Sequence, residues 1–386
     1  MPVREFGEIE MGLLKEVLDS GQLSSLSGGK MTPRFEREFA AILGAKHGVA
    51  MNSAMSVLHA CVKAAGAGAG DEVLCESFCV FATVAVLYNN AIPVHVDIKR
   101  DTFNMDPDKI EAKISDRTKA LIVTHVFGLP AEMDRIVEIA HRRGLIVIED
   151  CAHSILAKYK GRCTGTWGDI GSFSFQMSKQ LGLGDGGMAV TSDEKLRDAL
   201  ALNAGAPTFH SVAHDLYYNY RMNEMTAAVG VGQLQRIHGY VKGLQENARL
   251  YDAAVEDCPW ITIQRGPAEA EHTYHIWGAR FHGQDAGVSR DRFAEALKQA
   301  GCSLGIGYTK MAAYQHPMIQ KRLGYGRGCP LDCPLYEGDL NRYPAGTCPV
   351  VEEVMPNVLM ASPFGPRGRH EKNAAALRKA WEACAS

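Results

Sequence analysis

Lys179 lies between a segment rich in aromatic and serine residues and a glycine-rich turn, in the stretch SFSFQMSKQLGLGDGGMAV at residues 172–190. An ammonium group in surroundings suited to burial is costly unless it is paired, neutralised or used chemically. Most lysines instead extend along the surface with the charged end in water. A chemical role for Lys179 therefore requires partners elsewhere in the chain.

Asp150 is the first such partner. It follows an apolar run in VIEDCAHS, residues 147–154, directly after Glu149. Open α/β sheets bind ligands at the carboxyl ends of their strands, and the hairpin-like segment 159–171 lets Asp150 and Lys179 face one cleft. Alone, Asp150 fits a structural role, as a helix cap or in an ion pair, as well as it fits a chemical one. Together, an amine able to form a Schiff base and a carboxylate able to hold a pyridinium proton are the groups that pyridoxal 5′-phosphate (PLP) requires.

Groups that could bind a phosphate stand near both residues. Ser172 and Ser174 precede the lysine, and MNSAMSV at residues 51–57 offers hydroxyls and free backbone N–H groups where a helix is expected to begin. Each serine alone is more often a cap or a surface hydroxyl. With Lys179 and Asp150 they form a consistent set.

Two other motifs are weaker. The segment AAGAGAGDE, residues 64–72, follows a helical pattern and precedes a strand pattern, which is the reverse of the order in a dinucleotide-binding loop. It predicts a helix stop and turn, and this argues against a nicotinamide dehydrogenase. Cys329, Cys333 and Cys348 lack the spacing of a zinc site, so the eleven cysteines are interpreted as reduced core residues.

Composition sets the class of protein. The net charge is −3, without a basic block or an acidic tail, so neither nucleic acid nor a membrane surface is an expected partner. No run is apolar enough for a membrane span, and the first residues lack the features of a signal peptide. We therefore expect a cytoplasmic protein.

Short apolar runs alternate with helical patterns between about residues 45 and 195. The runs at 72–78, 93–98, 120–128 and 144–153 predict strands buried on both faces, and the patterns at 55–66, 106–114 and 131–144 predict helices. This alternation predicts an α/β fold with a mostly parallel sheet covered by helices.

The pattern changes further along the chain. Residues 219–237 continue into a long helical stretch, followed by short strands, helices at 289–301 and 367–385, and an irregular segment from about 311 to 350. We expect an N-terminal helix or arm at 1–30, a large domain at 31–240 and a smaller C-terminal α+β domain at 241–386.

Several blocks of the sequence, in order, carry a family resemblance. They are FEREFAAILGAKHGVAMNSA (35–54), GDEVL (70–74), RTKALIVTHVFGLPAEMD (117–134), VIEDCAHS (147–154), GDIGSFSFQMSKQLGLGDGGMAVTSD (168–193) and NYRMNEMTAAVGVGQLQR (219–236). The chain resembles the PLP-dependent sugar aminotransferases of the DegT/StrS type, in the fold-type I (aspartate aminotransferase) superfamily. The resemblance implies a large PLP-binding domain with a sheet of the seven-stranded type.

The resemblance also implies roles for individual residues. Lys179 matches the lysine that binds the cofactor covalently and moves the proton, and Asp150 matches the partner of the pyridine nitrogen. His153 matches a residue beside the ring, and Ala152 a small residue under its face. Ser174 matches a phosphate ligand.

Asn219 in NYRM matches a residue that reaches the phosphate of the neighbouring subunit. The resemblance therefore implies a homodimer with shared active sites. Gly184, Gly186 and Gly187 fit a tight backbone turn beside the cofactor.

The chain departs from the family at the expected phosphate-binding helix. The family has a Gly-Thr or Ala-Thr pair there, whereas this chain has Ala54 and Met55 followed by Ser56. Ser53 or Ser56 replaces the missing hydroxyl, or backbone amides hold more of the phosphate.

A second departure lies in ESFCVFATV, residues 76–84, where the family places an aromatic ring over the cofactor. Val80 stands at that position, so Phe78 or Phe81 is the candidate ring. A shift of one residue along a strand would turn the ring to the opposite face, but in a loop it would not.

The implied activity is a two-stage transamination. An amino donor, glutamate or glutamine, gives its nitrogen to a keto-sugar or keto-cyclitol, in secondary metabolism or in surface-sugar synthesis. Two alternatives stay open, a PLP-dependent dehydratase or aromatase acting on an aminocyclohexenone-type substrate and a PLP-binding sensor or subunit without turnover. Residues 305–336 lack the sequence pattern that is usual for the substrate loop of the family, which points to an unusual acceptor.

Overall fold

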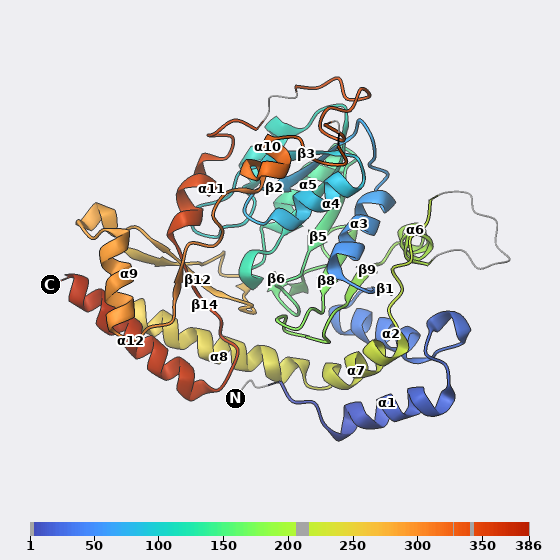
Figure 1. Cartoon of the computed structure of the whole chain (residues 1–386), viewed down its shortest axis with the longest axis horizontal. Helices are drawn as coiled ribbons and strands as arrows, with labels where there is room; N and C mark the ends of the chain where they lie inside the picture. The colour runs from blue at the N-terminus through green and yellow to red at the C-terminus, as the bar shows by residue number, and fades with distance from the viewer. Residues whose placement is uncertain (1–3, 206–215, 327, 340–342, 386) are drawn as a thin grey trace.

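The structure is a computed structural model that describes residues 4–205, 216–326, 328–339 and 343–385. Its centre is a seven-stranded sheet in the order β1-β9-β8-β5-β4-β2-β3 (Figure 1). The strands are β1 (His47–Met51), β2 (Glu72–Glu76), β3 (Ile92–Val96), β4 (Thr118–Thr124), β5 (Ile146–Asp150), β8 (Ile170–Ser174) and β9 (Gly187–Thr191). Neighbours from β3 to β8 pair in parallel, and β9 is antiparallel to β8 and β1. The predicted α/β fold with a mostly parallel seven-stranded sheet is confirmed.

Helices cover both faces of this sheet. On one face, α3 (Ala54–Ala64), α4 (Val80–Tyr88) and α6 (Glu194–Ala204) pack against the strands. On the other face lie α5 (Met133–Arg142) at one end and α1 (Glu8–Ser20), α2 (Met31–Leu43) and α7 (Glu224–Leu234) at the other. Leu121 and Ile122 belong to clusters on opposite faces, which explains why the strand sequences are continuously apolar.

A second, four-stranded antiparallel sheet lies beside the first and has its own apolar cluster. Its strands are β10 (Ile261–Ile263), β12 (Trp277–Phe281), β14 (Val358–Ala361) and β13 (Gly305–Ile306). The helices packed on it are α8 (Ile237–Val255), α9 (Arg290–Gln299) and α12 (Arg367–Ala385). Figure 1 shows α8 running from the large sheet to this second sheet, so one helix belongs to both parts.

Short elements connect these layers. The strands β6 (Lys158–Tyr159), β7 (Arg162–Cys163) and β11 (Ala270–Glu271) form a small third sheet that contains the predicted hairpin. The irregular C-terminal segment contains α10 (Pro317–Gln320) and α11 (Pro349–Val354). Single 3₁₀ turns occur at Ser25–Ser27, Val126–Gly128, Gly283–Ala286, Ala313–Gln315 and Met355–Asn357.

Two helix predictions were wrong in detail. The pattern at 106–114 forms two 3₁₀ turns, Pro107–Lys109 and Glu111–Lys113, because so short a segment makes too few helical hydrogen bonds to offset nucleation. The helical pattern from residue 219 begins only at Glu224, since Arg221 pairs with Met51 in extended conformation. It is also interrupted between α7 and α8.

All eleven cysteines lie in the described residues and are free thiols, nine of them buried. This agrees with the interpretation of reduced core residues. Among the described helices, none combines the length and the apolar character that crossing a membrane requires.

A buried carboxylate connects α7 to α2. Glu224, the first residue of α7, accepts hydrogen bonds from the backbone N–H groups of Met31 (2.6 Å) and Thr32 (3.2 Å), the first two residues of α2. These N–H groups have no acceptor within their own helix, and a carboxylate is favoured at a helix N-terminus. Glu224 is only 1% exposed, so these hydrogen bonds are shielded from water.

We expect Glu224→Ala to lower the free energy of unfolding by about 2 kcal/mol, because two buried amides lose a charged acceptor. Urea denaturation measures this change. Glu38→Ala on the exposed face of α2, where Glu38 pairs with Arg34, is the control and should cost less than about 0.5 kcal/mol. Equal losses in the two variants would contradict the capping role of Glu224.

Candidate active site

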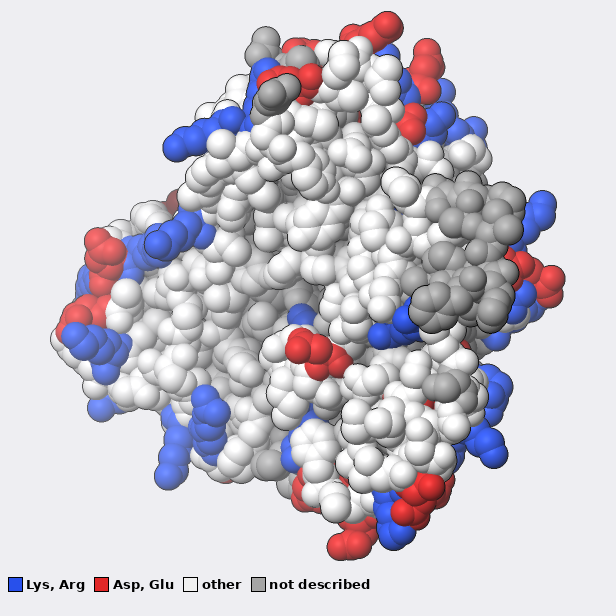
Figure 2. Space-filling view, turned by 45° about the vertical axis from the view of Figure 1, so that its right-hand side comes forward, with Lys and Arg blue, Asp and Glu red and all other residues white. Residues whose placement is uncertain are grey.

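A pocket of about 340 Å³ opens at the edge of the large sheet where the parallel strands end. Figure 2 shows the molecule hollowed near the centre of this face, with most charged side chains at the periphery. The lining residues are Ser53, Ala54, Met55, Leu58, Cys79, Phe81, Thr124, Asp150, Ala152, His153, Ser174, Gln176, Ser178, Lys179, Asp185 and Gly186. They come from the last residues of β4, β5 and β8, from the loops that follow β5 and β8, and from the N-terminal parts of α3 and α4.

Lys179 lies in the loop between β8 and β9. The loop is closed by hydrogen bonds from Met177 N to Gly184 O and from Leu183 N to Phe175 O, both 2.8 Å. Burial lowers the pKa of Lys179, and the nearby Asp150 carboxylate partly offsets this effect. The amine therefore loses its proton more readily than an exposed lysine, as a nucleophile or base requires.

Asp150 is the last residue of β5, and its neighbours in the sheet are Thr124 on β4 and Ser172 on β8. The backbone N–H of Ala152 donates a hydrogen bond of 3.0 Å to Oδ1. Burial raises the pKa of Asp150, although the Ala152 amide and Lys179 oppose the shift. Such a carboxylate gains most from a cationic partner inside the pocket.

His153 lines the pocket and stacks on His275, with ring centroids 4.5 Å apart and planes 16° apart. Burial holds the pKa of both imidazoles well below the usual range, and the nearby Lys179 adds to this effect, so both rings are neutral. Gln180 donates a 2.6 Å hydrogen bond to His153 O, which ties the residue after the lysine to this wall. The Nδ1 atoms of both rings are buried and have no hydrogen-bond partner among the described residues.

The N-terminus of α3 forms the opposite wall. Ser53 is its N-cap and accepts the Ser56 N–H at 3.1 Å, while Ala54 and Met55 are the first helical residues and line the pocket. Their N–H groups have no acceptor within the helix, which makes this end a suitable anion site.

Gly187 allows β9 to approach this helix end. A Cβ there would lie 2.8 Å from the backbone nitrogen of Ala54 and 2.9 Å from Phe173 O. Gly184 and Gly186 have φ values of +93° and +147°, consistent with the predicted turn. A phosphate bound here would meet backbone N–H groups together with the buried Ser174 hydroxyl.

Phe81 rather than Phe78 borders the pocket. Phe78 lies in the bend between β2 and α4, and Phe81 lies in the first turn of α4, so the two rings do not alternate along one strand. Phe81 can therefore face the pocket and is 52% exposed, whereas Phe78 is buried in a stack on Tyr308, 4.8 Å between centroids. Val80 does not line the pocket.

Two predicted site residues lie outside this lining. Ser56 is used in the helix cap, because its hydroxyl donates to Asn52 Oδ1 at 2.6 Å. Asn219 is exposed, in the extended segment where Tyr220 O accepts the Asn52 N–H at 2.7 Å. It lies beside the strand that leads into α3 but does not border the pocket of its own chain.

Several residues of the pocket wall were not predicted from the sequence. They are Leu58, Cys79, Thr124, Gln176, Ser178 and Asp185. Thr124 could have been predicted, because it lies in the apolar run at 120–128. The carboxyl ends of parallel strands meet at one edge of the sheet, where Asp150 was also expected. The backbone N–H and hydroxyl of Ser178 both donate to Gln176 Oε1, at 2.8 and 2.6 Å, which shapes the loop of the lysine.

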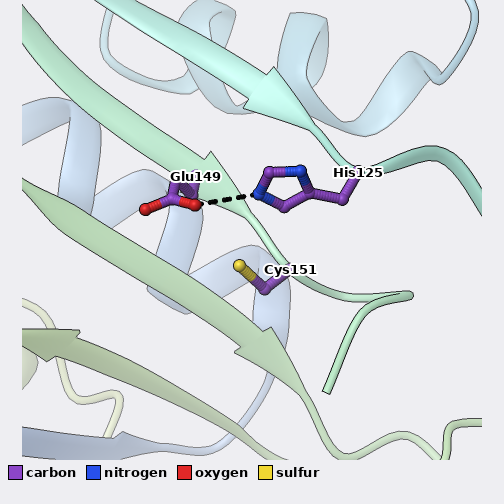
Figure 3. Close-up of side chains that lie close together, drawn as sticks. All are labelled: His125, Glu149 and Cys151. Atoms are coloured by element: carbon purple, nitrogen blue, oxygen red, sulfur yellow. Dashed lines mark hydrogen bonds and ion pairs between the residues drawn. The ribbon is translucent and has the colours of Figure 1, made fainter. Parts of the chain in front are cut away.

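A buried cluster of His125, Glu149 and Cys151 lies next to Asp150 (Figure 3). His125 Nδ1 accepts the Ala131 N–H at 3.1 Å, so the proton is on Nε2, which donates to Glu149 Oε2 at 2.9 Å. A metal ion would need the lone pair that this proton occupies.

Both carboxylate oxygens of Glu149 accept hydrogen bonds. Oε2 also accepts the Gly165 N–H (2.8 Å), and Oε1 accepts the Gly168 N–H (2.7 Å). The cluster is therefore a structural network that fixes the end of β5 and the hairpin after it, and through them the carboxylate of Asp150.

The fold and the pocket together define an α/β enzyme of the class that binds a carbonyl cofactor through a buried lysine. A carboxylate at a strand end suits a protonated ring nitrogen, and a helix N-terminus with a bare glycine beside it suits a phosphate. The unpartnered Nδ1 of His153 offers a further contact to the ring. These groups fit PLP.

Comparison with known proteins identifies the family. The model of the DegT/DnrJ/EryC1/StrS aminotransferase family matches residues 5–338. The spore coat polysaccharide biosynthesis protein SpsC of Bacillus subtilis is 35% identical over 333 residues, 83% of this chain and 85% of that protein. A putative L-glutamine:3-amino-2,3-dideoxy-scyllo-inosose aminotransferase of Streptoalloteichus tenebrarius is 34% identical over 339 residues, 83% and 82% of the two chains.

The fold is also similar to that of a solved structure. The crystal structure of S. venezuelae DesV in complex with a ketimine intermediate matches with a TM-score of 0.83 and 29% identity, covering 97% of this chain and 94% of that one. The chain belongs to the DegT/DnrJ/EryC1/StrS aminotransferase family. It is an aminotransferase whose cofactor is PLP.

The raised pKa of Asp150 predicts how stability depends on pH in the PLP-free protein. A carboxyl group with a raised folded-state pKa contributes stability at low pH that is lost as the pH rises through that pKa. Relative to wild type, Asp150→Asn should therefore become progressively more stable as the pH rises above about 4, the usual pKa of an aspartate. Urea unfolding at a series of pH values measures the difference.

Asp108→Asn is the control of opposite sign. Arg135 lowers the pKa of the exposed Asp108, so this variant should lose stability relative to wild type as the pH rises. A stability difference between Asp150→Asn and wild type that does not change with pH would contradict an energetic cost of the ionised Asp150.

Proposed function

We propose that this aminotransferase moves an amino group from glutamate or glutamine to a keto-sugar or keto-cyclitol. The observation that carries the proposal is the convergence of a buried lysine, a strand-end carboxylate and a helix N-terminus on one pocket. The support for the acceptor class comes from relatives whose names refer to polysaccharide biosynthesis and to an aminocyclitol precursor. The name of the second relative also specifies glutamine as the donor.

Bound PLP supplies an electron-withdrawing ring with a carbonyl group that can carry the amino group between the two substrates. Lys179 Nζ, favoured in its neutral form by burial, would take a proton from the substrate carbon and return it. Asp150 would keep the ring nitrogen protonated, and His153 would contact the ring from one side. The N–H groups at the start of α3 would orient the phosphate.

Phe81 and Met55 would cover the cofactor and separate it from water at the pocket mouth. Thr124 would contribute a hydroxyl beside Asp150, since it is buried, lines the pocket and is the neighbour of Asp150 in the sheet. The acceptor would enter from the open side of the hollow, where the lining is largely uncharged (Figure 2).

Wild-type protein should bind PLP as a yellow species, and Lys179→Ala should lose the absorption band of the lysine-bound cofactor while retaining its fold. Addition of glutamate or glutamine to the yellow protein should bleach the band and release one equivalent of the oxo acid. Spectroscopy and mass spectrometry of the released acid measure both effects, with Lys195→Ala on exposed α6 as a folded lysine control.

Protein that stays colourless with added PLP would contradict the cofactor assignment. A yellow protein that releases no oxo acid from either donor would contradict amino transfer and support a PLP-binding subunit without turnover. Release of ammonia or water from an aminocyclohexenone, without net amino transfer, would support the dehydratase alternative.

We further propose a homodimer in which Asn219 completes the phosphate site of the neighbouring subunit. Asn219 is exposed and lies outside its own pocket, and the same segment contacts the strand that leads into α3. Exposed apolar side chains of Phe81, Met177 and Leu216 are consistent with a partner surface around this region. Localisation in the cytoplasm stays a prediction.

Mixing Lys179→Ala and Asn219→Ala subunits tests the shared site. If Asn219 acts across the interface, each mixed dimer has one intact site, and random association should restore about a quarter of wild-type activity. Activity after subunit exchange, with each variant alone as control, is the measurement. If Asn219 acted in its own subunit, no mixed dimer would contain an intact site and activity would not recover.

A further inference from the structure

The N-terminal arm, residues 4–7, crosses from α7 and α8 towards the pocket. Glu5 O accepts hydrogen bonds from Gln233 Nε2 (2.8 Å) and Arg236 Nη1 (3.0 Å), and Glu5 N donates to Tyr240 Oη (2.9 Å). The arm is therefore held by its backbone on a rigid helical surface, and not by exposed side-chain contacts alone.

A partly buried ion pair fixes the end of the arm. Glu10, 2% exposed, binds Arg236 Nη1 at 2.9 Å and accepts the Gly7 N–H at 2.8 Å. The ion pair and the Gly7 hydrogen bond fix the backbone where the arm joins α1. They therefore set the direction in which Arg4 extends from these helices.

Arg4 points from the arm into the loop that contains Lys179. Its guanidinium donates to Met177 O at 2.6 Å and to Lys179 O. The backbone hydrogen bonds within the described loop use the carbonyls of Phe175, Gln176, Gly184 and Gly186, which leaves those of Met177 and Lys179 to Arg4. A planar guanidinium with several donors can bind two carbonyl groups at once.

Gly182 provides room for this contact. A Cβ at Gly182 would lie 2.6 Å from Arg4 Nη1 and 2.6 Å from Met177 O. The loop thus lacks a side chain where the guanidinium approaches it.

The other side of the guanidinium faces the C-terminal part of the chain. Its central carbon lies 5.9 Å from the centroid of the Phe364 ring, and that ring makes an edge contact with His275 at 6.1 Å. His275 in turn stacks on His153 in the pocket wall. Arg4 therefore contacts the lysine loop on one side. On its other side, Phe364 and His275 connect it to His153 in the pocket wall.

We propose that Arg4 is a positioning residue for Lys179. By holding the carbonyls of Met177 and Lys179, the N-terminal arm fixes the backbone of the loop and keeps the amine turned into the pocket. The inference depends on PLP as the cofactor of Lys179 but not on the donor or acceptor in the proposed function.

Arg4→Ala and Arg4→Lys in the full-length protein test this role. We expect Arg4→Ala to raise hydrogen exchange at residues 175–186 of the PLP-free protein by about tenfold, because the loop then opens locally. The affinity for PLP should fall about fivefold or more, and the pH at which the absorption band of the lysine-bound cofactor titrates should shift, since the amine is held less firmly. Arg4→Lys retains the charge and one donor group, so it should recover part of each effect.

Arg367→Ala is the matched control, because Arg367 is exposed and forms a local ion pair with Glu371 on the surface of α12. It should leave exchange at 175–186, PLP affinity and the band titration unchanged. Wild-type values of all three quantities in Arg4→Ala would overturn the proposal. Losses spread over the whole chain, with no recovery in Arg4→Lys, would also overturn it and would assign Arg4 a general stabilising role.

These measurements are independent of amino transfer. A wild-type protein that binds PLP but accepts no donor would contradict the proposed function and leave the role of Arg4 testable. If Arg4→Ala does not fold, the comparison of Arg4→Lys with wild type still decides the matter through exchange in the loop and the band titration.

Discussion

The structure depends on the burial of two opposite ionisable groups at one sheet edge. Burial lowers the pKa of Lys179 and raises that of Asp150, so each group alone would favour its neutral form, and each attracts the other towards its charged form. This balance makes the amine reactive and leaves the carboxylate in need of a cationic partner. In the proposed function, a phosphate-bearing pyridinium cofactor would satisfy the second need and would react with the first group.

The surrounding network keeps this arrangement rigid. Glu149 binds His125 and two glycine amides of the following hairpin, so the end of β5 cannot shift without breaking a buried, charge-assisted set of hydrogen bonds. Gln180 connects the lysine loop to His153, and Arg4 holds the same loop from outside. Residues far apart in the sequence thus position one amine, and none of them needs to contact the substrate.

Some elements of the structure could be predicted from the sequence and others could not, for physical reasons. The parallel strands were predictable because both faces are buried and their residues are uniformly apolar. The segment 106–114 was not, because its helical spacing is too short to show whether a helix or isolated turns will form. At residues 76–84 the question was whether Phe78 or Phe81 faces the pocket, and it depended on the start of α4, which periodicity over so few residues does not locate.

The sequence by itself determined the chemistry. Lys179, Asp150 and the serines predict a PLP site, because an amine and a carboxylate that can face one cleft are groups that this cofactor requires, and the ordered blocks indicate the family. Only the tertiary structure decided which groups share the pocket. Thr124, Gln176 and Asp185 line it while Ser56 caps a helix instead, and Arg4 reaches the lysine loop from the other end of the chain. Such contacts depend on the distances and angles between packed elements, which the spacing of residues along the chain does not encode.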